Sequence, residues 1–184
     1  GGVASVRGGR QAHPPTVKKV IYKKLNQKEN KLALCSAIAA TKSKEIIESR
    51  GHKTKNISDF PMIVSDKIES VLKTSEMVKI LRSLNLLQDI ERLKSRKPRT
   101  GKSLLRGRGT KIGKSVLFVV SKAEKLSKAC NGIPGVDVQT TKNLSVLDLA
   151  PGADPIRLTV YSTTALKEIG EIKSPHLELM VSMN

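Results

Sequence analysis

SVLFVVS, residues 115–121, contains the strongest strand signal in this chain: Val116–Val120 is apolar without interruption and rich in β-branched side chains. Shorter candidate strands are FPMIVS (60–65), VDV (136–138) and LTVY (158–161). Continuously apolar strands are typical of a parallel sheet that is covered on both faces. Helical patterns separate these runs, so the sequence predicts an α/β fold: a three-layer sandwich with a mostly parallel sheet flanked by helices, plus an extended basic arm and a basic loop.

The first predicted helix covers residues 26–49. Asn26 suits its N-cap, Glu29 follows in the spacing of a capping box, and Gly51 is the expected stop. Five apolar side chains recur at helical intervals and are expected to face the core: Leu32, Cys35, Ile38, Ala39 and Ile46.

Three further helices are predicted over residues 74–87, over residues 122–130, and directly after Ser162 as a cap. The first and last of these should turn six side chains inward: Met77, Val78, Leu81, Leu84, Leu166 and Ile169. In the tail after Gly170, LELMVSM suits either a short strand or a docked peptide. We therefore expect an arm (1–20), an α/β domain with a basic loop (21–170) and a C-terminal tail (171–184).

Positive charge is concentrated in two segments. The chain carries a net charge of +18, of which residues 1–60 contribute +9 and residues 92–114 contribute +10. Residues 61–91 carry −1, and residues 115–184 are neutral. A near-neutral body with two basic surfaces is the pattern of a nucleic-acid-binding protein.

The segment RLKSRKPRTGKSLLRGRGTKIGK (92–114) has ten basic residues and no acidic one. It has no apolar periodicity long enough to bury a face, so we expect it to fold only when a phosphate backbone supplies counter-charge. A solvated basic loop is the alternative. The residues of this loop expected to bind RNA are Arg96, Lys97, Arg99, Lys102, Arg106, Arg108, Lys111 and Lys114.

GGVASVRGGRQAHPPTVKKV (1–20) lacks helical or strand periodicity and is rich in Gly, Pro and basic residues. It has too little apolar surface to dock on a body, so we expect an extended arm. Nineteen extended residues span roughly 60 Å at about 3.3 Å per residue. The further residues expected to bind RNA are Arg7, Arg10, His13, Lys18, Lys19, Lys23, Lys24, Arg50 and His52.

Catalysis has no support in the sequence. GTKIGKS (109–115) superficially resembles a phosphate-binding loop, but Arg108 stands where the pattern needs glycine, and the strand follows the motif instead of preceding it. The three histidines are dispersed along the chain, so each should be exposed or in contact with phosphate. We expect no enzyme activity, no cofactor, no metal and no small-molecule substrate.

Cys35 and Cys130 lie in apolar helical settings and are expected to be buried free thiols, with a disulfide between them as the minor alternative. No apolar run approaches 18 residues, and no signal-peptide pattern is present, so we expect no membrane partner. Because the first residue is Gly1 and not Met, we expect the chain to begin inside a longer natural sequence.

Only four aromatic residues occur, and two of them, Phe60 and Phe118, belong to strand runs. The others are Tyr22 and Tyr161. Without exposed rings, single strands should not be bound by base stacking. Contacts from Lys, Arg and the backbone to phosphate and 2′-OH groups remain, which suits a large folded RNA. Charge alone does not exclude DNA, but no helix has the basic face of a groove reader.

An ordered set of motifs resembles ribosomal protein four of the large subunit (the L-four family) in its archaeal and eukaryotic form, and is most similar to the archaeal form. The motifs are RGGRQAHPP (7–15), NKLALCSAIAAT (30–41), RGH (50–52), FPMIVSDKIES (60–70), KTSEMVKILRSL (73–84), SVLFVVS (115–121), IPGVDV (133–138) and LAPGADPIRLTVYSTTALKEIG (149–170).

This resemblance implies a scaffold protein of the cytoplasmic ribosome whose partners are large-subunit rRNA and neighbouring ribosomal proteins. It implies that Gly1–Lys19 is the inner limb of a loop that reaches toward the peptide exit tunnel, and that the family's N-terminal region is missing. Residues 92–114 would be the family's second rRNA-binding loop, here with fewer arginines. Asn131 and Gly132 replace a usual Arg-Asn, and Ile156 replaces a usual glycine, which questions the turn before Arg157.

A free-standing basic RNA-associated factor, such as an assembly protein or an RNA-modifying enzyme, is the alternative. An enzyme of this fold class should have a substrate or cofactor crevice at the carboxyl ends of its strands. The sequence offers only short Ser, Thr and Lys connections there.

Overall fold

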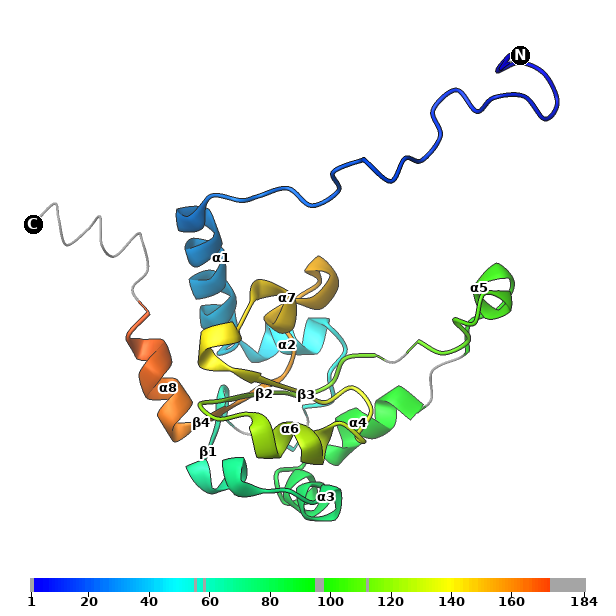
Figure 1. Ribbon diagram of the computed structural model, residues 1–184. Coiled ribbons are helices and arrows are strands. Elements are labelled where there is room, and N and C mark those ends of the chain that lie inside the picture. The colour runs from blue at the N-terminus through cyan, green and yellow to red at the C-terminus, as the bar shows by residue number, and fades with distance from the viewer. Residues whose placement is uncertain (1, 55, 58, 95–97, 112, 173–184) are drawn as a thin grey trace, which may run out of the picture.

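The computed structural model describes residues 2–54, 56–57, 59–94, 98–111 and 113–172. These residues form a four-stranded sheet in the order β1-β4-β2-β3, and every neighbouring pair is parallel (Figure 1). Its strands are β1 (Met62–Val64), β2 (Leu117–Val120), β3 (Asp137–Thr140) and β4 (Thr159–Ser162). The α/β prediction is confirmed, with a sheet that is parallel throughout.

Strand β2 lies at the centre of the molecule and is fully buried. Because side chains alternate along a strand, Phe118 and Val120 enter one core cluster while Leu117 and Val119 enter another. Helices α3 (Thr74–Ser83), α4 (Leu87–Lys94) and α6 (Glu124–Cys130) contribute to the first cluster, and α1 (Gln27–Ala40), α7 (Val146–Leu149) and α8 (Thr163–Gly170) to the second (Figure 1). The predicted three layers are confirmed.

The single helix predicted over residues 26–49 is wrong, since α1 ends at Ala40 and a separate α2 covers Lys44–Ser49. The Thr41 hydroxyl donates to the Ile38 carbonyl at 2.6 Å, and Lys42 N–H turns back to Ala39 O at 3.2 Å. A side-chain hydroxyl thus competes for the carbonyl that would continue the helix.

The capping and packing predicted for this helix are confirmed only in part: Asn26 stands at the N-cap of α1 and Gly51 follows the C-cap of α2, but Leu32, Ala39 and Ile46 are exposed. Asn26 makes no side-chain cap; its amide instead donates to Glu29 at 3.3 Å. Leu32 is 49 % exposed, because only the C-terminal half of α1 packs on the body, where Ala37 is buried. In α2 the buried side chain is Ile47 and not its exposed neighbour Ile46.

The other predicted elements are mostly confirmed, with shifted bounds. The predicted helix over 74–87 ends at Ser83, and α4 follows as a separate helix. Ser162 caps α8 by accepting from Ala165 N–H at 3.2 Å, but Leu166 is exposed. Strand β1 is an edge strand with Ile63 exposed, so its predicted burial on both faces is wrong.

The structure also contains short elements that the sequence did not predict. They are η1 (Asp66–Ser70), α5 (Lys102–Leu105), η2 (Thr141–Asn143), α7 and η3 (Pro151–Ala153).

Both cysteines are free thiols. Cys130 is buried, and burial raises the pKa of its thiol to about 12, whereas Cys35 is only half-buried. None of the helices in the described part of the chain is both long and apolar enough to cross a lipid bilayer. The tail predictions for LELMVSM lie outside the described residues.

Candidate nucleic-acid interface

The arm is extended, as predicted. Residues 2–25 form no helix or strand, are exposed at every position, and lead away from α1 and the body (Figure 1). Near the N-terminal end of the arm, Gly9 N–H donates to Val6 O at 3.0 Å and Arg10 N–H donates to Val3 O at 3.2 Å. A Cβ on Gly9 would stand 2.0 Å from Val3 O, so this turn requires glycine. Exposed along the arm are Arg7, Arg10, His13, Lys18, Lys19, Lys23 and Lys24.

The expectation that no aromatic ring is exposed is wrong for Tyr22. Its side chain is 87 % exposed, because the root of the arm stands clear of the body. Lys23 and Lys24 follow it directly, and Phe118 and Tyr161 are buried as core residues. A ring in a basic, unfolded segment can stack on an unpaired base, which is the mode of contact that the sequence argument excluded.

The basic loop has more local structure than its charge predicts. Helix α4 continues through Arg92 to Lys94, because Ile90 and Leu93 bury its apolar side. Helix α5 lies at the far end of the loop, and Arg99 N–H donates to Gly109 O at 2.8 Å between the two limbs (Figure 1). Exposed in this loop are Lys102, Arg106, Arg108 and Lys111, whereas Arg96 and Lys97 lie outside the described residues.

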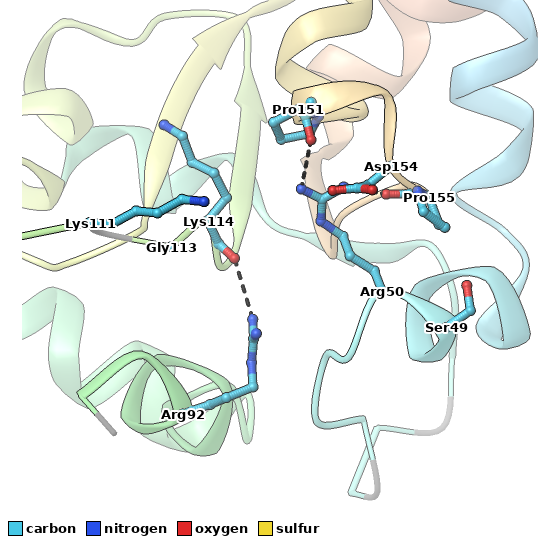
Figure 2. Close-up of a pocket in the computed structure, with 10 residues that line it drawn as sticks. Ser49, Arg50, Arg92, Lys111, Gly113, Lys114, Pro151, Asp154 and Pro155 are labelled. Atoms are coloured by element: carbon cyan, nitrogen blue, oxygen red, sulfur yellow. Dashed lines mark hydrogen bonds between the residues drawn. The ribbon is translucent and has the colours of Figure 1, made fainter. Parts of the chain in front are cut away.

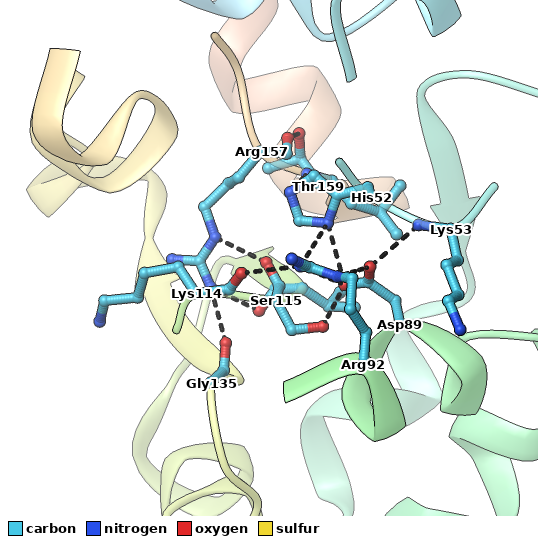
Figure 3. Close-up of polar contacts among 11 residues, drawn as sticks. His52, Lys53, Asp89, Arg92, Lys114, Ser115, Gly135, Arg157 and Thr159 are labelled. Atoms are coloured by element: carbon cyan, nitrogen blue, oxygen red, sulfur yellow. Dashed lines mark hydrogen bonds and ion pairs between the residues drawn. The ribbon is translucent and has the colours of Figure 1, made fainter. Parts of the chain in front are cut away.

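Both ends of the loop are tied to one buried carboxylate, Asp89 (Figure 3). Arg92 Nε donates to Asp89 Oδ1 at 3.0 Å and Ser115 Oγ donates to Asp89 Oδ2 at 2.5 Å. Arg92 Nη2 also donates to Lys114 O at 3.3 Å, and Lys53 N–H donates to Asp89 Oδ1 at 3.0 Å. The two limbs are therefore joined where they leave the body.

These bonds determine the ionisation of Asp89. Burial by itself raises the pKa of a carboxyl group. Here the hydrogen bonds from His52, Ser115 and Arg92 outweigh burial and hold the pKa of Asp89 well below its usual range. Asp89 is therefore a buried anion, and its four donors stabilise that charge.

His52 is buried and bonded within the body, so the prediction that it is exposed is wrong. It is 5 % exposed, and its Nδ1 lies 2.9 Å from Asp89 Oδ2. Leu158 N–H donates to Nε2 at 3.3 Å, so Nε2 accepts and Nδ1 carries the proton that is donated to Asp89. No sequence pattern indicated this contact, because Asp89 is 37 positions away from His52 in the chain.

Arg157 is a buried organiser that the sequence analysis missed. It is 1 % exposed and donates to Ser115 O and Val116 O at 2.8 Å, to Gly135 O at 3.0 Å and to Asp137 Oδ2 at 2.7 Å. A lone arginine between Ile156 and the predicted strand over residues 158–161 was the available signal. Burial lowers the pKa of Arg157, and the bond to Asp137 opposes this effect.

The returning limb of the loop packs directly on Gly135. A Cβ at Gly135 would lie 2.6 Å from Gly113 O, and its φ of +77° also favours glycine. Ser115 N–H donates to Gly135 O at 2.7 Å. Ile156, the residue that questioned the turn before Arg157, is buried in the same core cluster as Leu149, and Arg157 keeps its internal bonds.

The carboxyl ends of the strands hold acidic side chains that are bound by the chain itself. Glu69 accepts from Ser121 N–H and from Ser162 Oγ, both at 2.9 Å, and Asp66 accepts from Thr163 Oγ1 at 2.6 Å. A cavity of about 680 Å³ lies there. The carboxylates of Asp66 and Glu69 accept from internal donors, Glu124 is a third carboxylate in the lining, and the described residues contain no group of three potential metal ligands.

Three of the predicted RNA-binding residues, Arg50, Lys111 and Lys114, lie around one cavity of about 460 Å³ with Arg92 (Figure 2). Arg50 donates to Pro151 O at 2.9 Å and to Pro155 O at 2.5 Å. The structure thus brings side chains together from α2, α4 and the returning limb of the basic loop. In the sequence, Arg50 belongs to a different basic segment from the other three residues.

Comparison with known proteins agrees with this architecture. A model of the ribosomal protein L4/L1 family matches residues 3–172. Large ribosomal subunit protein uL4 of Methanococcus aeolicus is 44 % identical over 165 residues, which cover 89 % of this chain and 66 % of that protein. The uL4 proteins of Haloquadratum walsbyi and Methanosphaera stadtmanae are 44 % and 40 % identical, over 89 % and 90 % of this chain and 65 % and 64 % of those proteins. The chain spans about 65 % of the length of these curated relatives.

Proposed function

The chain belongs to the ribosomal protein L4/L1 family, and we propose that it is a structural, non-catalytic constituent of the large ribosomal subunit that binds large-subunit rRNA. The observation that carries this proposal is the pair of exposed basic extensions on one folded body. The described residues of the arm (2–25) and of the loop outside α4 (98–111) contain no acidic side chain. Their charge requires a polyanion, and a folded rRNA provides phosphates on several sides of such extensions.

We propose that the arm reaches toward the peptide exit tunnel, as the family resemblance implies. Support comes from its extended, exposed backbone and from the absence of packing between residues 2–25 and the core clusters. A span of roughly 60 Å for 19 extended residues is long enough to pass deep into a folded RNA. The body would then remain at the rRNA surface, beside neighbouring ribosomal proteins.

A free-standing RNA-associated factor has less support. An RNA-modifying enzyme needs a crevice with available polar groups, and here two carboxylates at the carboxyl ends of the strands, those of Asp66 and Glu69, are engaged by internal donors. The deciding experiment is sedimentation of the tagged chain with large subunits of its source organism, followed by a high-salt wash. A ribosomal constituent stays with the subunit, and an assembly factor or modifying enzyme dissociates.

Deleting residues 1–19 should leave the body folded, because these residues make no contact with the core clusters. We expect the free energy of unfolding to change by less than about 0.5 kcal/mol, as for surface changes away from packed features. Urea denaturation measures this change. The truncated chain should still attach to the rRNA but disturb subunit assembly or the tunnel. A large loss of stability would show that the arm packs on the body.

Replacing Tyr22 with leucine should weaken binding to rRNA, because the exposed ring is expected to stack on an unpaired base. Stacking contributes about 1–3 kcal/mol per base, which corresponds to roughly 5- to 150-fold in affinity. Fluorescence anisotropy with a large-subunit rRNA fragment measures the loss. Tyr22→Phe is the matched control, since it keeps the ring and should bind like the original chain. Equal binding by the leucine variant would exclude stacking.

A further inference from the structure

Four basic side chains from distant parts of the sequence surround one cavity at the root of the basic loop. Arg50 follows α2, Arg92 belongs to α4, and Lys111 and Lys114 belong to the returning limb (Figure 2). We call this cavity the loop-root pocket. Asp154 is the one carboxylate among the residues that line it.

Three of these cations are positioned by internal bonds before any ligand arrives. The Arg50 guanidinium donates to the carbonyl oxygens of Pro151 and Pro155. The Arg92 guanidinium donates to Asp89 and to Lys114 O, and Lys114 Nζ lies 2.7 Å from Asp137 Oδ2. A pre-organised side chain loses little conformational entropy on binding, so more of the interaction energy appears as affinity. Lys111 is exposed and forms no ion pair within the described part of the chain.

The charge around the pocket stays positive after its internal ion pairs are counted. With Arg157 behind Lys114, there are five cations. Four carboxylates of the described residues oppose them: Asp89, Asp137, Asp154 and Asp148, which interacts with Arg157. Like charges repel when they converge, and an anion placed between them relieves that repulsion. Guanidinium groups bind phosphate oxygens through paired N–H donors, and lysine adds a mobile point charge.

We propose that the loop-root pocket binds one phosphate group, and that this phosphate belongs to the backbone of the RNA. The assignment of the source rests on the proposed function. A phosphate held here touches the body through Arg50 and the loop through Lys111 at the same time. It therefore fixes the direction in which the loop leaves the body, in addition to the bonds to Asp89.

The test compares Lys111→Gln with Lys79→Gln in the full chain. Lys79 lies exposed on α3, away from the pocket, so its variant controls for the loss of one positive charge. Affinity for a large-subunit rRNA fragment is measured at several salt concentrations. We expect Lys111→Gln to lower the affinity about 5- to 10-fold and to reduce the slope of log affinity against log salt by about 0.9, the value for one phosphate contact. The Lys79 variant should change neither.

Two further measurements separate the possible results. Titration with inorganic phosphate, followed by the Nε resonances of Arg50 and Arg92, should show binding that the rRNA fragment abolishes. If both variants bind rRNA with the same slope of log affinity against log salt, the loop-root pocket does not bind an RNA phosphate, and the proposed function is unaffected. Tight phosphate binding that rRNA does not displace would assign the pocket to a free anion instead. Failure of every variant and of the original chain to bind rRNA would overturn the proposed function itself.

Discussion

Replacing Arg96, Arg99, Arg106 and Arg108 with glutamine is expected to lower rRNA affinity on the order of a thousandfold at 0.1 M salt. If the arm and the loop together neutralise roughly 8–10 phosphates, log affinity falls with log salt at a slope of about −6 to −9. Each phosphate contact contributes about 0.7–0.9 to that slope, so the quadruple variant should flatten it by roughly three units. Filter binding between 0.05 and 0.5 M salt measures both quantities.

The matched control removes four lysines from the body instead. Lys73, Lys79, Lys125 and Lys128 are exposed around α3 and α6, away from the basic loop. Their glutamine variant has the same net charge as the loop variant, so it separates a local contact from the overall charge. We expect its slope to stay near that of the original chain. If the slope of the loop variant is also unchanged, the basic loop is solvated and does not contact the phosphates of the rRNA.

Replacing Asp89 with alanine should destabilise the body by about 3–5 kcal/mol, because it removes the anion of a buried ion pair and leaves the other donors unsatisfied. The groups that lose their acceptor are the His52 ring, Lys53 N–H, Ser115 Oγ and the Arg92 guanidinium. Urea denaturation measures the loss. Asp89→Asn keeps one oxygen acceptor and should cost less. A change below about 1 kcal/mol for alanine would show that the buried network does not hold the loop root together.

The same carboxylate predicts how stability depends on pH. The pKa of Asp89 is lower in the folded chain than in the unfolded chain, where it is about 3.9. A lowered pKa stabilises the fold above the unfolded value, and this stabilisation is lost as the pH falls toward the folded value. We expect unfolding below about pH 4 to be less steep in Asp89→Ala than in the original chain. Glu76→Ala, an exposed change on α3, should keep the original profile.

The sheet and the charged surfaces could be predicted because their signals are local. The apolar run of β2 required burial on both faces, and the structure places β2 at the centre of a parallel sheet. The Gly- and Pro-rich arm had no periodicity, and it is extended. The cap of α8 depends on Ser162 and on a backbone N–H three residues away. Each of these features is determined by neighbours in the chain.

The structure of the loop root depends on pairs that are distant in the sequence. Asp89 meets His52 across 37 positions, and Arg157 meets Ser115 across 42. No helical or strand period connects such residues, so His52 was assigned to RNA and Arg157 was overlooked. The packing of the layers brings them together, and burial then requires each polar group to find a partner. Local patterns alone thus predicted a parallel α/β body with two basic extensions, whereas the packing of the layers determines which charged side chains anchor the loop internally and which remain exposed.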